Sequence, residues 1–469
     1  MENLGANLNH SLTHSFTNSF TNSLTHSVTN LAPKKKTVAI IGGGYAGMAA
    51  AVKLAELDQT STVFEAAKIL GGRARRVDYL GMTLDNGQHI LSGAYTELLR
   101  MMALVGVSGT AFERIPLKLT FGIPAEFSLC APKLAAPWHM VAALLTAKGL
   151  DWSERIAAIR LMRALTASHF IVDHKLCVAD LMTIYRQPPK LVQFLWQPLT
   201  ISALNTPLAT ASAQVFANVL RDALATNRAA SDLILPTIDL TRLFPETAAT
   251  WLDTQGSRVQ TGCRITAIEK NDHGFEVVYG DHREQFSHVI VAVAPHQLDT
   301  LLSRDPAIRR IFSDSVAHFQ YEPITTIYLA FSPSQKLLPA TMLGRSSGLV
   351  QWFFNRETLS GETGLVAGVI SASGSYEALS LDELATTALG ELREWLPHLA
   401  SPLWHKVIQE KRATFACTAD LKRPATETDI PGLVLAGDYV DCDYPATLEA
   451  AVRNGCSAAE IIYATAKNL

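Results

Sequence analysis

Three glycines and one acid near the start of the chain have the residue types and the spacing that bind a dinucleotide. Gly42, Gly44 and Gly47 form the pattern G-x-G-x-x-G, and Glu65 follows after a second apolar run. The first glycine permits a tight turn, the second lets a pyrophosphate approach the backbone, and the third lets a helix pack on the sheet. An acid at the position of Glu65 accepts hydrogen bonds from two ribose hydroxyls and repels a 2′-phosphate.

The elements around these residues are the ones that the pattern requires. The β-branched run TVAII (37–41) predicts a buried strand, the Ala- and Leu-rich stretch 46–57 predicts a helix, and STVFE (61–65) predicts a second strand. Together they make a βαβ unit of about thirty residues. Its helix would present free N–H groups and the positive end of its dipole to the phosphates. A purely structural glycine turn is the alternative.

A second nucleotide anchor is expected close to the C-terminus. The apolar run GLVLAGDYV (432–440) predicts a strand that ends at Gly437 and Asp438, and a helix is expected to begin near Ala446 and Thr447. Asp438 suits a polyol hydroxyl, and the first N–H groups of the new helix suit the flavin O2 and the charge of a reduced flavin. Two anchors separated by nearly the whole chain suit a long, extended cofactor, which favours FAD over NAD.

The segment GGRARR (71–76) adds flexible backbone and positive charge just after the first anchor. Gly72 and Arg73 are expected to meet the remaining charge of the diphosphate. Arg75 and Arg76 either share that task or form an exposed basic pair.

These motifs resemble a large flavoprotein family that contains amine oxidases, protoporphyrinogen oxidases and phytoene desaturases. The stretch GMTLDNGQHILSGAYTELLRMMALVG (81–106) resembles, more specifically, the squalene-associated branch of that family, the hydroxysqualene dehydroxylases. The resemblance extends over the whole chain from residue 37, with its diagnostic motifs at the two ends. It implies an FAD enzyme whose apolar tunnel leads an isoprenoid substrate to the flavin, and whose reaction removes the hydroxyl of hydroxysqualene reductively to give squalene. No motif around Cys442 supports a covalent flavin, so we expect the FAD to be held noncovalently.

The resemblance also implies which residues hold FAD. Asp85 to His89 match a segment that runs past the flavin ring, and Val259 matches a position whose backbone holds the adenine. Taken alone, Asp-Asn-Gly is also an ordinary turn signal, and any strand valine would look like Val259. The expected cofactor-binding residues are Gly42, Gly44, Gly47, Glu65, Gly72, Arg73, Asn86, Gly87, Gln88, His89, Val259, Gly437, Asp438, Ala446, Thr447 and Leu448.

Three side chains are candidates for the acid that helps the hydroxyl leave: His89, Asp443 and Tyr444. An allylic alcohol can lose water to form a cation, which a hydride from reduced flavin would quench in a dry pocket with apolar or π walls. His89 is equally well explained as a histidine that fixes the flavin or as a core histidine bonded to backbone. Asp443, together with Asp441, is equally well explained as part of a solvated acidic loop.

The predicted fold class is α/β, with a discontinuous Rossmann-like FAD-binding domain and an inserted α+β substrate-binding domain. Helical patterns fill much of the region from 110 to 235, and strand-like alternation returns over 256–295 and 323–370. The aromatic stretches 193–199 and 351–355 either wall the tunnel or belong to an ordinary core. The expected FAD-binding segments are 37–110, 241–300 and 411–469, and the expected substrate-domain segments are 111–240 and 301–410.

Composition excludes several classes of protein. The chain has 469 residues, of which 48% are hydrophobic and 18% charged, with a formal net charge of −3, so nothing favours nucleic-acid binding. The six cysteines are scattered without a C-x-x-C pair, which predicts neither a disulfide scaffold nor a metal site and fits a reducing cytoplasm. The tail 1–36 contains a repeated polar four-residue unit and no secretory signal, so we expect it to be disordered.

Membrane contact follows from an isoprenoid substrate that is insoluble in water. No apolar run is long enough to span a bilayer. The segment 127–147 is the candidate for a peripheral contact at the inner face of the cytoplasmic membrane, and a buried helix is the alternative.

Three other functions are compatible with a flavin-binding fold: two are oxidations, and the third involves no catalysis. Desaturation of a carotenoid precursor would use the same fold, and residues 81–106 are the only discriminator. Amine oxidation fits less well, because no aromatic pair flanking the flavin can be assigned. A flavin-binding scaffold for isoprenoid enzymes would need no chemistry at all. A pyridine-nucleotide disulfide reductase is disfavoured, because neither a second G-x-G-x-x-G nor paired cysteines appear. NAD(P)H would therefore have to reduce the flavin without a Rossmann domain of its own, and the sequence does not identify the electron donor.

Overall fold

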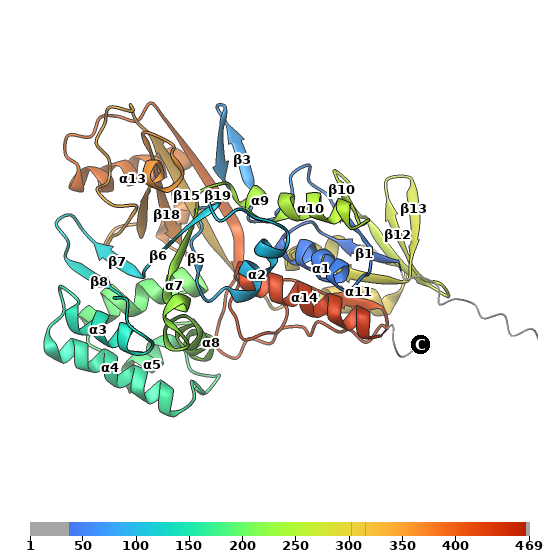
Figure 1. Cartoon of the computed structure of the whole chain (residues 1–469), viewed down its shortest axis with the longest axis horizontal. Coiled ribbons are helices and arrows are strands. Elements are labelled where there is room, and N and C mark those ends of the chain that lie inside the picture. The colour runs from blue at the N-terminus through green and yellow to red at the C-terminus, as the bar shows by residue number, and fades with distance from the viewer. Residues whose placement is uncertain (1–36, 302, 315, 466–469) are drawn as a thin grey trace, which may run out of the picture. The chain divides into compact units, whose positions relative to one another are not determined.

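The computed structural model describes residues 37–301, 303–314 and 316–465. The tail that we expect to be disordered, residues 1–36, lies outside the described residues. Two larger sheets organise the described chain, a parallel one and a mainly antiparallel one (Figure 1).

The five-stranded parallel sheet draws its strands from three distant parts of the chain. Its order is β10-β2-β1-β14-β20, and all neighbours run parallel. Runs such as VAII and HVIV are buried along their whole length, as strands covered on both faces require. The prediction of a discontinuous Rossmann-like domain is confirmed, while its segment boundaries stay predictions. The strands are β1 (Val38–Ile41), β2 (Ser61–Glu65), β10 (Arg258–Thr261), β14 (His288–Val291) and β20 (Leu433–Leu435).

The first and the last long helix pack on each other beside this sheet. α1 (Tyr45–Glu56) and α14 (Leu448–Ala464) lie side by side, blue and red in Figure 1. A Cβ on Gly455 of α14 would overlap the carbonyl oxygen of Ala46, so the missing side chain sets how closely the helices approach. Because β1 and β20 are parallel, the helices that follow them begin at the same edge of the sheet. Both predicted anchors therefore share one edge.

The seven-stranded sheet builds most of the second part of the molecule. Its order is β19-β15-β18-β17-β16-β7-β8, antiparallel except for the β16–β7 pair. One face packs on α13 (Leu381–Trp395), where Leu384 and Leu392 meet Ile327 and Leu329. The strands are β7 (Lys118–Phe121), β8 (Phe127–Cys130), β15 (Tyr321–Ala330), β16 (Met342–Gly344), β17 (Trp352–Asn355), β18 (Leu365–Ser371) and β19 (Trp404–Phe415).

Helices between residues 138 and 225 form the layer at the lower left of Figure 1. α4 (Trp152–Ala167) begins with a capping box between Asp151 and Glu154, which explains its sharp start. The segment 127–147 is not one helix: its first residues form β8, where Phe127 and Leu129 are buried, and only α3 (Trp138–Thr146) is helical. The others are α5 (Val178–Ile184), α6 (Pro189–Leu191), η1 (Val192–Trp196), α7 (Gln197–Leu204), α8 (Ala213–Leu220) and η2 (Arg221–Ala225).

The other elements of the described chain are three small sheets and several short helices. Three small sheets have the orders β3-β4, β5-β9-β6 and β11-β12-β13. Among the described residues, none of the helices combines the length and the apolar character that a membrane span needs. The remaining strands are β3 (Arg76–Tyr79), β4 (Met82–Asp85), β5 (Leu91–Ser92), β6 (Phe112–Ile115), β9 (Leu233–Pro236), β11 (Ala267–Asn271), β12 (Gly274–Tyr279) and β13 (His282–Phe286). The remaining helices are α2 (Thr96–Leu104), η3 (Arg228–Ser231), α9 (Leu240–Leu243), α10 (Pro245–Thr254), η4 (Pro295–Thr300), α11 (Pro306–Asp314), α12 (Arg356–Ser360) and η5 (Ser375–Ala378).

Candidate functional site

The glycine turn between β1 and α1 contains two positions that only a glycine can occupy. Gly42 has φ +114°, and a Cβ there would lie 2.6 Å from the carbonyl oxygen of Ala292. A Cβ on Gly47 would overlap the carbonyl oxygen of Gly42. These two residues therefore shape the turn itself and the contact of α1 with it.

Gly44 has a different role, because it borders open space. A Cβ there would meet nothing closer than the Cα of Gly72, at 3.8 Å. Gly44 also pairs with Gly71 in an isolated bridge, so two stretches of bare backbone face each other. No side chain caps α1, and its first turn holds no acid, which leaves its positive end to an outside anion. This cradle fits a pyrophosphate, and a methyl group on Gly44 would begin to fill it.

Glu65 lies beside the cradle at the end of β2. Its two carboxylate oxygens accept hydrogen bonds from the N–H of Gly43 at 2.7 Å and the N–H of Ala67 at 2.8 Å. These bonds fix the carboxylate and leave lone pairs on both oxygens, enough for two ribose hydroxyls.

Val259 lies on β10, which is the edge strand next to β2. A cleft of about 400 Å³ opens at this edge, between β10, the loop after β2 and the first turns of α10. Its lining includes Lys68, Leu70, Val259 and Thr261. The position predicted to hold adenine therefore borders a cleft close to Glu65.

The two anchors meet through an ion pair. Arg73 Nη2 lies 2.6 Å from Asp438 Oδ1, and Arg73 Nη1 donates to the carbonyl of Ala413 at 2.7 Å. Burial lowers the pKa of Arg73 and is the largest single effect, but the charge and hydrogen bond of Asp438, together with the charge of Glu410, outweigh it, so the net shift is upward. The predicted cofactor residues near both ends of the chain are thus in direct contact.

The segment Asp85 to His89 runs next to this pair. Asn86 Nδ2 donates to the carbonyl of Arg73 at 3.1 Å, and Gln88 Oε1 accepts from Arg356 Nη1 at 2.7 Å. Asp85 accepts from the N–H of Leu240 at 2.9 Å, and burial raises its pKa to about 7.

His89 is held by its own loop. Its Nδ1 lies 2.7 Å from the carbonyl oxygen of Gly87, and burial lowers its pKa. A carbonyl partner requires a proton on Nδ1, so the neutral ring presents a lone pair at Nε2. This geometry favours an orienting role and does not favour the predicted role of proton donor.

The other two candidate acids point to different partners. Asp443 has a side chain that is 68% exposed and lies 3.5 Å from Arg221. The Tyr444 hydroxyl donates to Asp222 at 2.9 Å, and burial raises its pKa. Neither side chain shares a partner with His89, so these geometries favour the solvated-loop explanation for Asp443 and a structural one for Tyr444.

The start of α14 matches its predicted position to within one residue. Thr447 is the N-cap, its hydroxyl accepts from the N–H of Ala450 at 3.2 Å, and the helix begins at Leu448. Ala446 lies in the preceding loop. The helix N-terminus therefore follows directly on the loop that carries Asp438.

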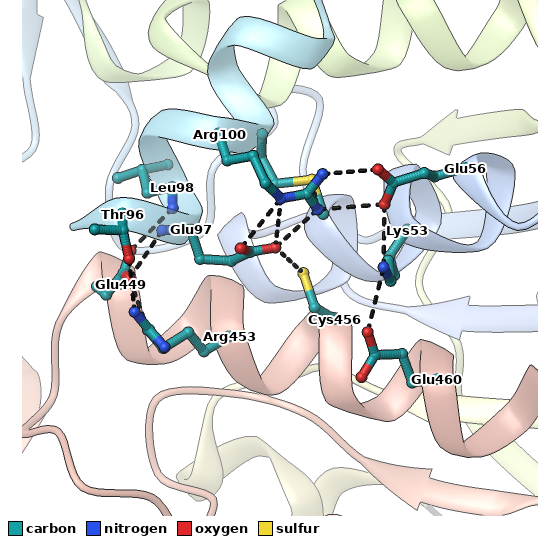
Figure 2. Close-up of polar contacts among 11 residues, drawn as sticks. Lys53, Glu56, Thr96, Glu97, Leu98, Arg100, Glu449, Arg453, Cys456 and Glu460 are labelled. Atoms are coloured by element: carbon teal, nitrogen blue, oxygen red, sulfur yellow. Dashed lines mark hydrogen bonds and ion pairs between the residues drawn. The ribbon is translucent and has the colours of Figure 1, made fainter.

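Sequence reasoning missed Glu449, a fully buried acid in the first turn of α14. Figure 2 shows its carboxylate accepting from the N–H groups of Glu97 at 3.0 Å and Leu98 at 2.9 Å, while Arg453 pairs with it at 2.7 Å. Glu449 thus caps α2 and ties it to α14. The only signal in the sequence is an acid within the apolar run ATLEAAV.

Arg356 was missed as well. Its side chain is 5% exposed and joins Gln88 to Glu362, which lies 2.9 Å away. Nothing in its local sequence, FFNRETL, distinguishes it from a surface arginine. Its partner Gln88 lies in the loop after β4, far away in the sequence.

The two aromatic stretches contribute to the core. Phe194 and Trp352 both pack against Phe121, with ring centroids 5.7 and 5.1 Å away. Trp196, Phe353 and the neighbouring aromatic side chains are buried. Ordinary core packing accounts for these stretches as described, and the tunnel wall stays a prediction.

Comparison with known proteins agrees with this geometry. The family model described as "Flavin containing amine oxidoreductase" matches residues 45–463. Hydroxysqualene dehydroxylases from Zymomonas mobilis and Rhodopseudomonas palustris are 27% and 28% identical, over 90% and 92% of this chain and 98% and 99% of theirs. A 15-cis-phytoene desaturase from Arabidopsis thaliana is 24% identical over 90% of this chain and 79% of its own length.

Solved structures support the fold. An oxidoreductase from Methanosarcina mazei superposes with a TM-score of 0.72 at 15% identity, covering 90% of this chain and 100% of the other. The family match spans nearly all of the described residues and includes α1 and all but the last residue of α14. The chain therefore belongs to the flavin-containing amine oxidoreductases.

Proposed function

We propose that this chain is an FAD-dependent oxidoreductase that reductively removes the hydroxyl group of hydroxysqualene to give squalene. The observation that carries the proposal is the length of the match to two hydroxysqualene dehydroxylases, 90% and 92% of this chain and nearly all of each relative. The reaction takes up two electrons and two protons and releases water. The protein must therefore bind a reductant, orient the hydroxyl and keep bulk water away from the reacting carbon.

We infer that the cradle would bind the diphosphate of FAD. Gly44, Gly72 and the uncapped start of α1 would hold the pyrophosphate, because bare backbone and the helix dipole favour phosphate there. Glu65 would accept the ribose hydroxyls, and the cleft beside Val259 would take the adenine. A dinucleotide without a 2′-phosphate suits the negative charge of Glu65.

The second anchor, near the C-terminus, would bind the flavin end of FAD. Asp438 and the start of α14, from Ala446 to Leu448, would contact the ribityl chain and the ring, together with the segment 86–89. When bound in its reduced form, the flavin supplies the two electrons of the reaction. The lone pair at His89 Nε2 would accept the O–H of the substrate and so orient it.

We propose that FAD is bound noncovalently. The thiol of Cys442 already lies 3.3 Å from Arg423 Nη2 and 3.6 Å from Asn454 Nδ2, inside its own loop. Acid precipitation should therefore release all yellow colour into the supernatant, whereas colour that stays with the pellet would contradict noncovalent binding.

We propose a peripheral membrane contact through the exposed apolar side chains of residues 134–156. Trp138 is 64% exposed and Trp152 65%, and the nearby Leu134, Leu145 and Ile156 are exposed as well. Lys148 in this stretch and Lys133 directly before it are exposed, and their positive charge suits an anionic lipid surface at the cytoplasmic face. Wild type should float with phosphatidylglycerol vesicles, W138A/W152A should not, and L403A, which removes a remote exposed leucine, should behave as wild type. Equal flotation of all three would contradict the assignment.

A phytoene-type desaturase is the second candidate, since the Arabidopsis relative matches 90% of this chain. Lipid extracts from cells that produce hydroxysqualene, with and without this chain, separate the candidates. Conversion of hydroxysqualene to squalene supports the main proposal, and persistence of hydroxysqualene contradicts it. Desaturated products from phytoene-producing cells would support the second candidate instead.

A further inference from the structure

Arg423 belongs to the segment between β19 and β20, and its side chain contacts the loop that joins β20 to α14. Its guanidinium donates to five backbone carbonyls of this one loop: those of Asp438 at 2.6 Å, Tyr439 at 3.2 Å, Cys442 at 3.0 Å and Tyr444 at 2.8 Å, and that of Val440. The thiol of Cys442 lies 3.3 Å from the same side chain. All three guanidinium nitrogens are therefore used on a single short stretch.

An aromatic ring supports the Arg423 side chain. Its guanidinium stacks over the ring of Phe415, with 4.9 Å between its central carbon and the ring centroid. Among the described residues, no carboxylate forms an ion pair with it. Arg423 thus acts through the shape of its donor fork, because a planar guanidinium can serve several carbonyls that a lysine ammonium cannot reach together.

The loop it organises has no regular structure of its own. Residues 436–447 contain neither helix nor strand, so their carbonyls find no ladder of partners. Other contacts also hold the loop: among them, Asn454 Nδ2 donates to the carbonyl of Gly437 at 2.8 Å, and the N–H of Asp441 donates to the carbonyl of Pro424 at 2.8 Å. Asp438 lies in this loop, and α14 starts at its end.

We propose that Arg423 is a positioning residue for the cofactor. By holding the carbonyls of residues 438–444, it fixes the direction of the Asp438 side chain toward Arg73 and the place where α14 begins. The inference rests on the proposed FAD site. It states that the Arg423 side chain keeps the loop of this site ordered before any cofactor binds.

The test compares two substitutions of Arg423 with a matched control. R423K keeps the charge but loses the fork, and R423M loses both. Arg345 is the control: it also donates to two carbonyls, those of Ser347 at 3.1 Å and Glu391 at 2.9 Å, and stacks on an aromatic ring, but beside the seven-stranded sheet. For R423K, R423M and R345M, we would measure the Kd for FAD, the melting temperature of the apoprotein, and hydrogen–deuterium exchange of the peptide covering 436–447.

We expect both Arg423 variants to raise the Kd for FAD by about tenfold or more. Without the fork, FAD binding would have to order the loop, and the free energy of one charge-assisted hydrogen bond corresponds to about that factor in Kd. Exchange in 436–447 should rise in the apoprotein of both. R345M should lower the melting temperature but leave the Kd for FAD and the exchange of the 436–447 peptide unchanged. If R423M does not fold, R423K and its exchange pattern decide.

The inference is overturned if R423K binds FAD within twofold of wild type, because charge alone would then suffice. It is also overturned if the Arg423 variants lose only melting temperature, as the control does. A wild-type protein that takes up no FAD would instead contradict the proposed function, so the two failures are distinguishable.

Discussion

Arg73 and Asp438 are 365 residues apart in the chain, yet their side chains pair at 2.6 Å. The pair follows from topology: β1, β2 and β20 share one parallel sheet, so the segments after them gather at a single edge. Asp438 has a side chain that is only 8% exposed, and Arg73 provides its countercharge.

Breaking this pair should cost both stability and cofactor binding. D438N leaves Arg73 without its anion, and we expect the free energy of unfolding to fall by about 2 kcal/mol. The Kd for FAD should rise, because the amide side chain in D438N is uncharged and has only one acceptor oxygen, so it would hold Arg73 less firmly. Urea unfolding of the apoprotein and FAD titration measure both, and D443N, at an exposed carboxylate of the same loop, is the control. An unchanged Kd in D438N would contradict the assignment of Asp438.

Substitutions at two glycines of the turn, Gly44 and Gly47, should impair different properties of the protein. In Gly44→Ala the new methyl group meets no atom closer than 3.8 Å, so the protein should fold but bind FAD at least about tenfold more weakly. In Gly47→Ala the methyl group meets the carbonyl of Gly42, and the melting temperature should fall sharply. Thermal unfolding and FAD titration separate these effects. Gly109→Ala, in an exposed and open loop, should change neither property.

If Gly44→Ala bound FAD as wild type does, the cradle would not be the pyrophosphate site.

Glu449 should matter far more than other acids of α14. In E449Q one of the two N–H groups at the start of α2 loses its acceptor and Arg453 loses its ion-pair partner, so we expect the free energy of unfolding to fall by about 2–4 kcal/mol. E460Q is the control: Glu460 pairs with Lys53 at 3.2 Å, but its side chain is 59% exposed (Figure 2), and its loss should cost less than about 0.5 kcal/mol. Chemical denaturation of both variants decides, and equal losses would contradict the capping role.

Asp85 should make stability depend on pH. Its pKa is raised from 3.8 to about 7, so the folded state holds a proton that the unfolded state has lost between these values. Stability from this group is fully present below about pH 4, and it is lost progressively as the pH rises from there to about 7. In D85N the loss of apoprotein stability between pH 5 and pH 8 should be smaller than in wild type, by roughly 2–4 kcal/mol.

The matched control is D58N, at an exposed aspartate, which should keep the wild-type pH profile. Identical profiles for wild type and D85N would show that the Asp85 carboxyl is already ionised at pH 5.

Local elements of the fold could be predicted from the sequence, whereas contacts between residues far apart in the chain could not. The glycine turn, the strands at 38–41 and 61–65 and the start of α14 follow from nearest-neighbour chemistry, and all are found where predicted. Arg356 and Arg423 could not be predicted, because a lone arginine reveals nothing about the distant carbonyls and amides it will meet. Asp443 and Tyr444 were chosen for their proximity in sequence to α14, but their side chains turn toward Arg221 and Asp222.

One measurement tests the central claim most directly: anaerobic mixing of the purified protein, loaded with FAD and reduced, with hydroxysqualene. The account predicts that flavin reoxidation and squalene formation proceed together in a one-to-one ratio. Flavin that stays reduced while hydroxysqualene is recovered intact would contradict it.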